Sequence, residues 1–122
     1  MSWTTVCIAL AVVVAALLML KRAGQISRKQ ARAHLKNGAL LVDVRTPSEF
    51  NARHLPNAIN LPLDQLETVL PQRVRDKHQL LLLHCQSGMR SGMANKKLKG
   101  MGYPNAFNLG SYARAAQVVS EE

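Results

Sequence analysis

The sequence LLLLHCQSGMRS, residues 80–91, joins a run of leucines to a short polar stretch. The leucines predict a strand that is buried on both faces of a parallel sheet, and the residues from Ser91 onward predict a helix. Cys85 therefore lies at a turn from a strand into a helix. The N–H groups and the dipole at a helix start favour a thiolate and can also bind an oxyanion. The turn is a candidate site for a nucleophilic cysteine.

Other residues of this turn fit the same chemistry. Gly88 permits a positive φ or a close backbone approach, and Arg90 brings a cation five residues after Cys85. Ser87 and Ser91 offer hydroxyl donors or a helix cap. The alternative is a buried structural cysteine, since a free cysteine packs well as a small hydrophobe.

Outward from this turn, strand-like and helix-like segments alternate along the chain. Strands are predicted at residues 39–44, 59–61, 79–84 and 105–109. Helices are predicted from Ser27 to Asn37, from Thr46 to His54, from Pro62 to Leu70 with Pro71 as its end, from Ser91 to Lys99, and from Tyr112 to Val119. This alternation predicts an α/β fold, a small open parallel sheet flanked by helices on both faces.

Two of the predicted strands end in residues that carry chemistry. Asp43 and Arg45 lie at the end of the strand at 39–44, and Cys85 follows the strand at 79–84. Ligands of open parallel sheets bind beyond the carboxyl ends of the strands. We therefore expect these two turns to be neighbours.

The N-terminal part of the chain is apolar. Residues 3–20 contain no charged side chain, and Lys21 and Arg22 close the run. A run of this length can cross a bilayer as a helix, so we predict a transmembrane anchor at residues 1–22 that precedes a folded domain at residues 23–122. A cleaved signal peptide is the alternative, but its basic residues would precede the apolar run and a small-residue cleavage site would follow it.

The charge of the chain sets the expected location and partners. The net charge is +9, and every lysine and arginine follows residue 20. The positive-inside rule then places the C-terminal domain in the cytoplasm, on a single-pass protein of the inner (cytoplasmic) membrane. Such a domain attracts anionic lipid headgroups and small anions. Nucleic acid is not an expected partner, because few aromatic residues accompany the basic ones and no nucleic-acid-binding motif is present.

The cysteines and histidines predict neither a disulfide nor a metal site. Cys7 lies inside the apolar run and Cys85 in the turn, which places them too far apart to bridge. The four histidines lack the spacing of metal ligands: His34, His54, His78 and His84. We expect no metal and no cofactor.

Four motifs follow one another along the domain. They are LVDVRTPSEF at residues 41–50, HLPNAINLP at residues 54–62, CQSGMRS at residues 85–91, and GY with FNLG at residues 102–103 and 107–110. Together they resemble the signatures and the active loop of the rhodanese family of sulfurtransferases. The resemblance runs from Ile26 to about Ala116.

The resemblance implies a mechanism. Cys85 would attack the outer sulfur of a small anionic donor such as thiosulfate, hold it as a persulfide, and pass it to a thiol, to cyanide or to a protein acceptor. The backbone N–H groups of the loop would stabilise the charge on sulfur, and Arg90 would orient the donor or brace the loop. The substrate- and anion-binding residues implied are Gln86, Ser87, Gly88, Met89, Arg90 and Ser91.

The remaining polar residues of the motifs have expected structural roles. Asp43 and Arg45 could support the active loop, although a buried ion pair that shapes the fold is the favoured role. His84 precedes Cys85, and neighbours on a strand point to opposite faces, so His84 is expected to be structural. His54 belongs to a structural motif of the family.

The chain departs from the family pattern at one motif and leaves other functions open. The sequence GSY at residues 110–112 stands where many members carry a second glycine and an aromatic residue, which would change the pocket wall and the donor preference. Phosphatases of related fold place one more residue between cysteine and arginine than the four found here, and arsenate reduction is a further alternative. A noncatalytic membrane-tethered scaffold, or a sulfur or redox sensor, is the alternative from another class. The presence of Cys85, Gly88 and Arg90 together favours an enzyme of the thiosulfate:cyanide sulfurtransferase type.

Overall fold

The computed structural model describes residues 2–21 and 24–121. In chain order the elements are α1 (Trp3–Lys21), α2 (Arg28–Lys36), β1 (Leu40–Asp43), α3 (Pro47–Ala52), β2 (Ile59–Asn60), η1 (Leu63–Gln65), α4 (Leu66–Arg73), β3 (Leu81–His84), α5 (Met89–Gly100), β4 (Ala106–Gly110) and α6 (Tyr112–Ser120). Strands and helices alternate as the sequence predicts. The boundary expected between residues 22 and 23 falls outside the described residues.

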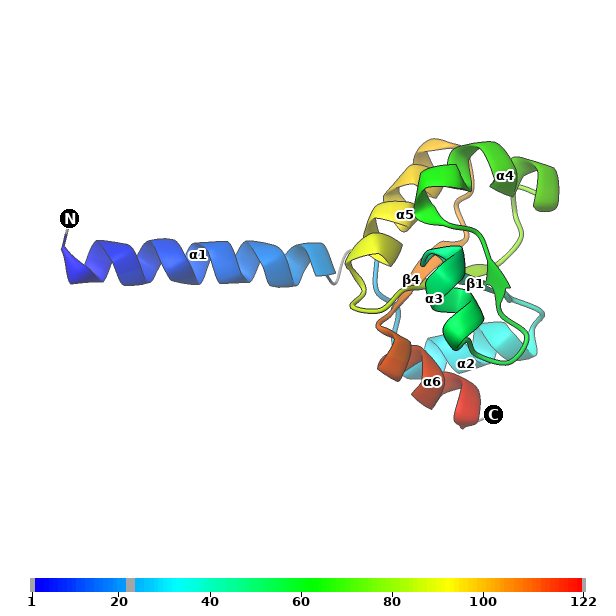
Figure 1. The fold of residues 1–122 in the computed structure, drawn as a ribbon, viewed down its shortest axis with the longest axis horizontal. Coiled ribbons are helices and arrows are strands. Elements are labelled where there is room, and N and C mark those ends of the chain that lie inside the picture. Colours follow the sequence, from blue (N-terminus) through cyan, green and yellow to red (C-terminus); the bar gives the residue numbers. More distant parts are fainter. Residues whose placement is uncertain (1, 22–23, 122) are drawn as a thin grey trace.

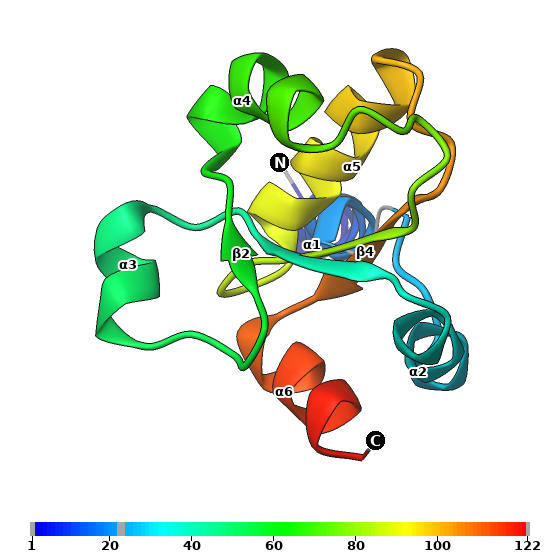
Figure 2. The ribbon, with the colours of Figure 1, turned by 90° about the vertical axis from the view of Figure 1, so that its right-hand side faces the viewer.

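The strands form one parallel sheet in the order β2-β1-β3-β4. β1 pairs with β3 over its whole length, so that Asp43 is level with His84 at the carboxyl ends. β3 pairs with β4 with an irregularity at the same end, between Leu83 and His84. Helices lie on both sides of the strands (Figure 2). The predicted parallel α/β fold is confirmed.

One face of the sheet is covered by α4 and α5 (Figure 1). Leucines of the helices, among them Leu66, Leu70 and Leu98, form one buried cluster with the strand residues that point the same way. These strand residues are Val42, Val44, Leu81, Leu83 and Cys85. The helix starts are set locally: Thr46 and Glu49 cap α3 reciprocally, and Gly88 with a φ of 97° begins α5.

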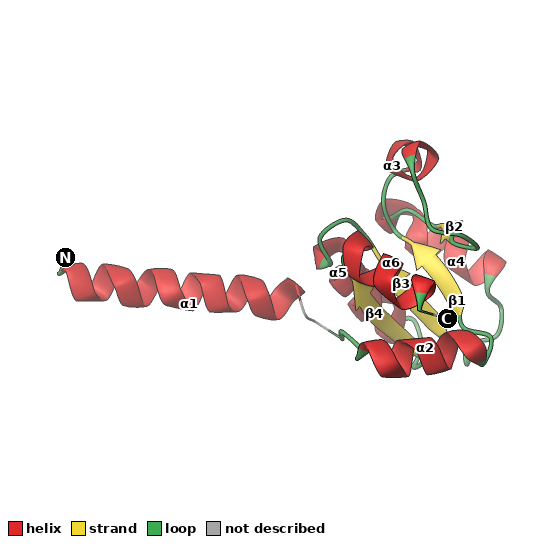
Figure 3. Cartoon of the chain, turned by 90° about the horizontal axis from the view of Figure 1, so that it is seen from below, coloured by secondary structure: helices red, strands yellow, loops and turns green. Residues whose placement is uncertain are grey.

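The opposite face is covered by α2 and α6, which lie side by side in front of the strands (Figure 3). Ala31, Ala115 and Val118 of these helices form a second buried cluster with the intervening strand residues, Leu41, Leu82 and Leu109. Successive side chains of a strand point to opposite faces. Cys85 therefore belongs to the α4–α5 face, whereas His84, against the ring of Tyr112, belongs to the α2–α6 face.

Two helix boundaries differ from the sequence prediction. Pro71 lies inside α4 and does not end it. Leu66, Leu70 and Val74 are all buried, and the Val74 N–H donates to the Leu70 carbonyl at 2.7 Å. Packing of this helix face therefore compensates for the one backbone hydrogen bond that proline removes. α5 begins at Met89 and not at Ser91, because Gly88 adopts the left-handed conformation that turns the chain at once.

α1 projects away from the rest of the chain (Figure 1). Its large apolar side chains are exposed, with Trp3 at 81% and Ile8 at 64%. Among residues 2–21 and 24–121, no helix is both long enough and apolar enough to cross a membrane, so the predicted transmembrane anchor is not supported.

Residues 24–26, just before α2, run along the outer edge of β4. The Asn108 N–H donates to the Gly24 carbonyl at 2.9 Å, and the Ile26 N–H donates to the Asn108 carbonyl at 3.0 Å. Gly24 has a φ of +65°, and a Cβ there would lie 1.8 Å from the amide nitrogen of Asn95 in α5. Any other residue here would have to displace the Asn95 side chain and adopt a φ that L residues rarely take, so glycine suits this close approach of residues 24–26 to β4 and α5.

Asp43 and Arg45 form the expected buried ion pair at the end of β1. Asp43 is fully buried and Arg45 is 4% exposed. The Arg45 Nε–H contacts both carboxylate oxygens at 3.0 Å, and Nη2 donates to Oδ2 at 2.7 Å and to the Arg53 carbonyl at 2.6 Å. The guanidinium also lies over the ring of Tyr112, 4.8 Å from its centre. This pair ties β1 to the segment after α3 and to α6.

Asp43→Asn should lower the free energy of unfolding by about 3–5 kcal/mol, because it leaves the Arg45 cation buried without its partner. Urea unfolding at neutral pH measures the change. Asp64→Asn, at an exposed carboxylate, is the matched control and should change the free energy by no more than about 0.5 kcal/mol. Equal effects of the two substitutions would contradict the role of the pair.

Candidate active site

Cys85 follows directly after β3 and has no exposed surface. Its N–H donates to the Gly110 carbonyl at 3.2 Å, which extends the pairing of β3 with β4 by one residue. Its side chain lies in the cluster with Val44, Leu83 and Ala94. The surroundings of the sulfur are therefore set by the sheet and by α5.

The sulfur itself is met by donors of its own loop. The Gly88 N–H donates to Sγ at 3.0 Å, and the Ser91 hydroxyl lies 3.6 Å from Sγ. Burial raises the pKa of the Cys85 thiol, but the Ser91 hydroxyl and the N–H groups of Ser91, Gly88 and Ser87 outweigh burial, so the net pKa is lowered. The geometry thus favours a thiolate at a site that water does not reach.

Ser91 connects the sulfur to β4 through Asn108. The Ser91 hydroxyl donates to Asn108 Oδ1 at 2.7 Å, and the same oxygen accepts the Gly110 N–H at 2.9 Å. The Asn108 amide nitrogen donates to the Gly88 carbonyl at 3.3 Å. The Gly88 and Gly110 carbonyls also lie 3.2 and 3.5 Å from the Ser91 hydroxyl. A hydroxyl has one proton, so Ser91 donates to one of these acceptors, to Asn108 or to the sulfur, and a thiolate is the strongest competitor among them.

Asn108 was not singled out by the sequence prediction. It is fully buried on β4, with apolar neighbours along the strand, Ala106 and Leu109. A polar residue inside an otherwise buried strand must find hydrogen-bond partners, and this was the available signal. Its partners include Gly88 of the loop that carries Cys85 and Ser91 of α5.

The segment after β4 also holds the active loop. The Tyr112 N–H donates to the Gln86 carbonyl at 3.3 Å, and Ser87 forms an isolated antiparallel bridge with Ser111. Gln86 and Ser87 are exposed, and Gly88 is buried. The predicted loop residues are thus brought together around Cys85, with the backbone of Gly88 closest to the sulfur.

Arg90 forms an ion pair that the sequence prediction missed. Its Nη1 and Nη2 donate to the two carboxylate oxygens of Glu49 at 2.6 and 3.0 Å. Glu49 Oε1 also accepts the Thr46 N–H at 3.1 Å, as part of the cap of α3. The hydrogen bonds from Arg90 lower the pKa of Glu49 to about 2, against a smaller opposing effect of burial. The capping pattern predicted Thr46 as a partner of Glu49 and gave no signal for Arg90.

A cavity of about 420 Å³ lies beside Arg90. It is lined by residues from the ends of β1 and η1 and from α5, including Val44, Thr46, Leu63, Arg90 and Met93. Met93 is 54% exposed, and the Arg90 side chain is 35% exposed. The cavity combines an apolar wall with two cations, Arg90 and Lys97, and one carboxylate, Asp64.

His84 and His54 take structural positions. His84 is fully buried on the face opposite Cys85, where burial lowers its pKa and its Nε2 lies 3.7 Å from Asp43 Oδ2. His54 is exposed, stacks on Phe50 with 3.9 Å between ring centres, and has Nδ1 2.8 Å from the Phe50 carbonyl. Neither imidazole is placed among the sulfur contacts described above.

The fold and the loop can now be compared with known proteins. The family model for the rhodanese-like domain matches residues 27–114. The chain belongs to the rhodanese family. Thiosulfate sulfurtransferase PspE of Escherichia coli K12 is 35% identical over 69 residues, which is 57% of this chain and 66% of PspE. Thiosulfate sulfurtransferase GlpE of Pseudomonas syringae is 31% identical over 85 residues, 70% of this chain and 78% of GlpE.

A solved single-domain sulfurtransferase shows a similar arrangement in space. The human single-domain sulfurtransferase TSTD1 superposes with a TM-score of 0.67 at 29% identity, covering 78% of this chain and 96% of TSTD1. Other relatives are longer: the match covers 18% of the adenylyltransferase and sulfurtransferase UBA4 of Candida albicans. The chain therefore spans less than two thirds of several rhodanese relatives that it matches.

The departure at residues 110–112 has a defined structural effect in this rhodanese domain. Gly110 has a φ of +100°, Ser111 caps α6 by accepting the Arg114 N–H, and Tyr112 packs under the guanidinium groups of Arg45 and Arg53. The aromatic residue thus anchors the start of α6 to the buried ion pair.

Ser91→Ala should raise the pKa of the Cys85 thiol, because it removes the side-chain donor that favours the thiolate. The pH dependence of alkylation in a Cys7→Ser background measures this pKa. Ser87→Ala is the control, since its hydroxyl accepts the Met89 N–H and is not a sulfur contact. An unchanged pKa in Ser91→Ala would show that the hydroxyl does not donate to the sulfur even when Cys85 is a thiolate.

Glu49→Gln should destabilise the domain at neutral pH by an amount that shrinks as the solution is acidified. A carboxyl with a lowered pKa stabilises the fold above its unfolded pKa, and this contribution is lost as the pH falls from about 4.5 toward about 2. Unfolding free energies of both proteins across this range give the difference. Glu67→Gln, which breaks the more exposed pair with Lys97, serves as control. A difference that is independent of pH would contradict the Arg90–Glu49 assignment.

Proposed function

We propose that this rhodanese is a sulfurtransferase that carries sulfane sulfur on Cys85. The observation that carries the proposal is the Gly88 N–H, which donates to Sγ at 3.0 Å at the start of α5. A donor in this position stabilises a thiolate before reaction and the negative sulfur of a persulfide afterwards. The lowered pKa of Cys85 agrees with an activated nucleophile.

The proposed reaction has two displacements. The Cys85 thiolate attacks the outer sulfur of thiosulfate, the sulfur–sulfur bond of the donor breaks, and sulfite leaves with the bonding electrons. The persulfide anion that remains on Cys85 is then attacked at its outer sulfur by cyanide or by a thiolate. That step breaks the Cys85 persulfide bond and returns the Cys85 thiolate, so no oxidant, reductant or general base is consumed.

Thiosulfate is the proposed donor for two reasons. PspE and GlpE, both similar to this chain, are named thiosulfate sulfurtransferases. The cavity beside Arg90 offers a partly exposed cation to a small anion. Arg90 is proposed both to face the donor and, through Glu49, to fix the start of α5 against α3.

A noncatalytic rhodanese-like scaffold is the second candidate. The observation in its favour is that Cys85 has no exposed surface, so a donor reaches the sulfur only when the loop moves. A phosphatase or an arsenate reductase is less well supported, because the loop has only four residues between Cys85 and Arg90.

Turnover of thiosulfate and cyanide to thiocyanate tests the proposal. Wild type and Cys7→Ser should turn over at the same rate, and Cys85→Ser should show none, because Cys7 lies on α1 and Cys85 carries the transferred sulfur. Circular dichroism establishes that each variant is folded. Absence of turnover by folded wild type, with thiosulfate and with a persulfide donor, would favour the scaffold.

We propose, as its location, attachment through α1 to the cytoplasmic side of the inner membrane. The exposed apolar side chains of α1 and the basic residues that follow it support this location. Replacing Val13 and Leu17 by lysine should move the full chain from the membrane fraction to the soluble fraction, whereas Val13→Leu with Leu17→Val should not. Alkaline carbonate extraction then separates insertion from surface attachment. A full-length wild-type chain found in the soluble fraction would refute the location.

A further inference from the structure

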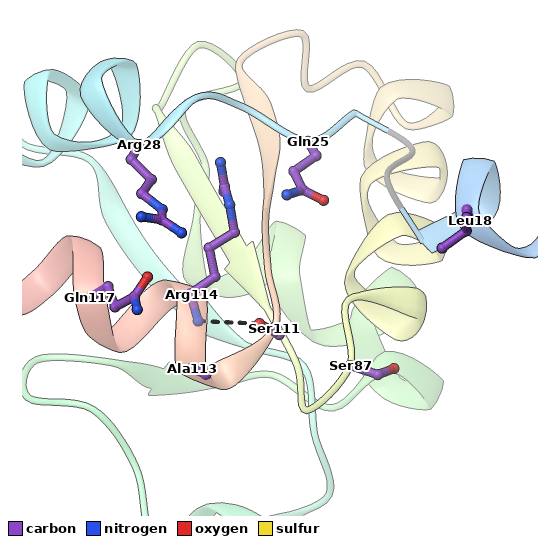
Figure 4. Close-up of a pocket in the computed structure, with 8 residues that line it drawn as sticks. All are labelled: Leu18, Gln25, Arg28, Ser87, Ser111, Ala113, Arg114 and Gln117. Atoms are coloured by element: carbon purple, nitrogen blue, oxygen red, sulfur yellow. Dashed lines mark hydrogen bonds between the residues drawn. The ribbon is translucent and has the colours of Figure 1, made fainter.

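A second cavity, of about 390 Å³, lies where five segments of the chain meet (Figure 4). The end of α1 contributes Leu18, the segment before α2 contributes Gln25, and α2 contributes Arg28. Ser87 comes from the active loop, and Ser111, Arg114 and Gln117 come from the start of α6. This cavity shares no lining residue with the cavity beside Arg90.

The charged side chains that line this second cavity are all positive. Arg28 and Arg114 are its two charged lining residues, and none of its lining residues is acidic. Burial lowers the pKa of Arg114, and repulsion by Arg28 lowers it further. Two guanidinium groups that face one cavity repel each other, and an anion placed between them removes this repulsion.

Arg114 is held in place before any ligand arrives. Its Nη1 donates to the Leu109 carbonyl at 2.8 Å and its Nη2 to the Ile26 carbonyl at 2.5 Å. A guanidinium has more donors than these two, so it retains N–H groups for a ligand. Figure 4 shows its side chain between those of Arg28 and Gln25. A cation that is already fixed loses little conformational freedom on binding.

Polar side chains line the same cavity beside the two arginines. The amides of Gln25 and Gln117 and the hydroxyl of Ser87 complete the wall. Donors thus approach from three segments, which suits a ligand with several acceptor oxygens.

From this arrangement we infer that the second cavity binds an oxyanion of the phosphate class. A phosphate group offers several charged oxygens to the two guanidinium groups and the surrounding N–H and O–H donors. Two sources share this chemistry. A phospholipid headgroup would place its chains beside Leu18 of α1, and a soluble phosphate ester would enter from solvent. The inference does not depend on sulfur transfer, because its readout is binding.

Isothermal titration of the full chain, held in a neutral detergent, with inorganic phosphate tests the soluble form. Arg28→Gln and Gln117→Glu should each weaken binding by roughly tenfold or more, the first by removing a charge-assisted contact and the second by supplying a competing carboxylate. Both residues are exposed, so the fold should be retained. Arg75→Gln, an exposed arginine outside the cavity, carries the same change of charge as Arg28→Gln and should bind as wild type.

Flotation with phosphatidylcholine vesicles, with and without phosphatidylglycerol, tests the lipid form. The lipid headgroup is identified as the ligand if wild type floats more on the anionic vesicles, and if this gain is lost in Arg28→Gln and Gln117→Glu but kept in Arg75→Gln. A soluble phosphate ester is identified if the two cavity variants lose phosphate binding, Arg75→Gln keeps it, and all variants float equally. The inference is overturned if neither experiment separates the two cavity variants from Arg75→Gln. Turnover of thiosulfate by wild type is measured alongside and reports on the proposed function alone.

Discussion

The sulfur of Cys85 is removed from water and is met by donors of its own loop. A buried thiol ordinarily resists ionisation, because the interior of a protein solvates charge poorly. Here the Gly88 N–H and the Ser91 hydroxyl face the sulfur and reverse this tendency. They can do so because β3 ends at His84 and α5 begins at Met89, which leaves a loop too short to point elsewhere.

The rest of the domain fixes that short loop from several directions. β4 holds it through Asn108 and Gly110, and the start of α6 holds it through Tyr112. Tyr112 in turn packs on Arg45, which Asp43 fixes at the end of the neighbouring strand. Arg90, in the first turn of α5, also ties the loop to α3 through its ion pair with Glu49. The loop geometry is therefore a property of the whole sheet edge, where three strands end.

Sequence patterns predicted the elements and the loop better than they predicted the contacts between them. The leucine run before Cys85 and Gly88 in the loop predicted the strand and the turn, because these depend on local periodicity and φ, although α5 begins two residues earlier than predicted. The pairing of Arg90 with Glu49 and of Ser91 with Asn108 joins residues 41 and 17 positions apart, and no local pattern encodes such distances. Pro71 shows the reverse case, in which buried leucines override a local helix-breaking signal.

The intact mass of the full chain after exposure to thiosulfate tests the central claim most directly. The account predicts a gain of one sulfur atom in wild type and in Cys7→Ser, its loss on adding cyanide, and no gain in Cys85→Ser. A folded wild-type protein whose Cys85 reacts with an alkylating reagent but gains no sulfur, from thiosulfate or from a persulfide donor, would contradict it. So would a gain of sulfur that persists in Cys85→Ser.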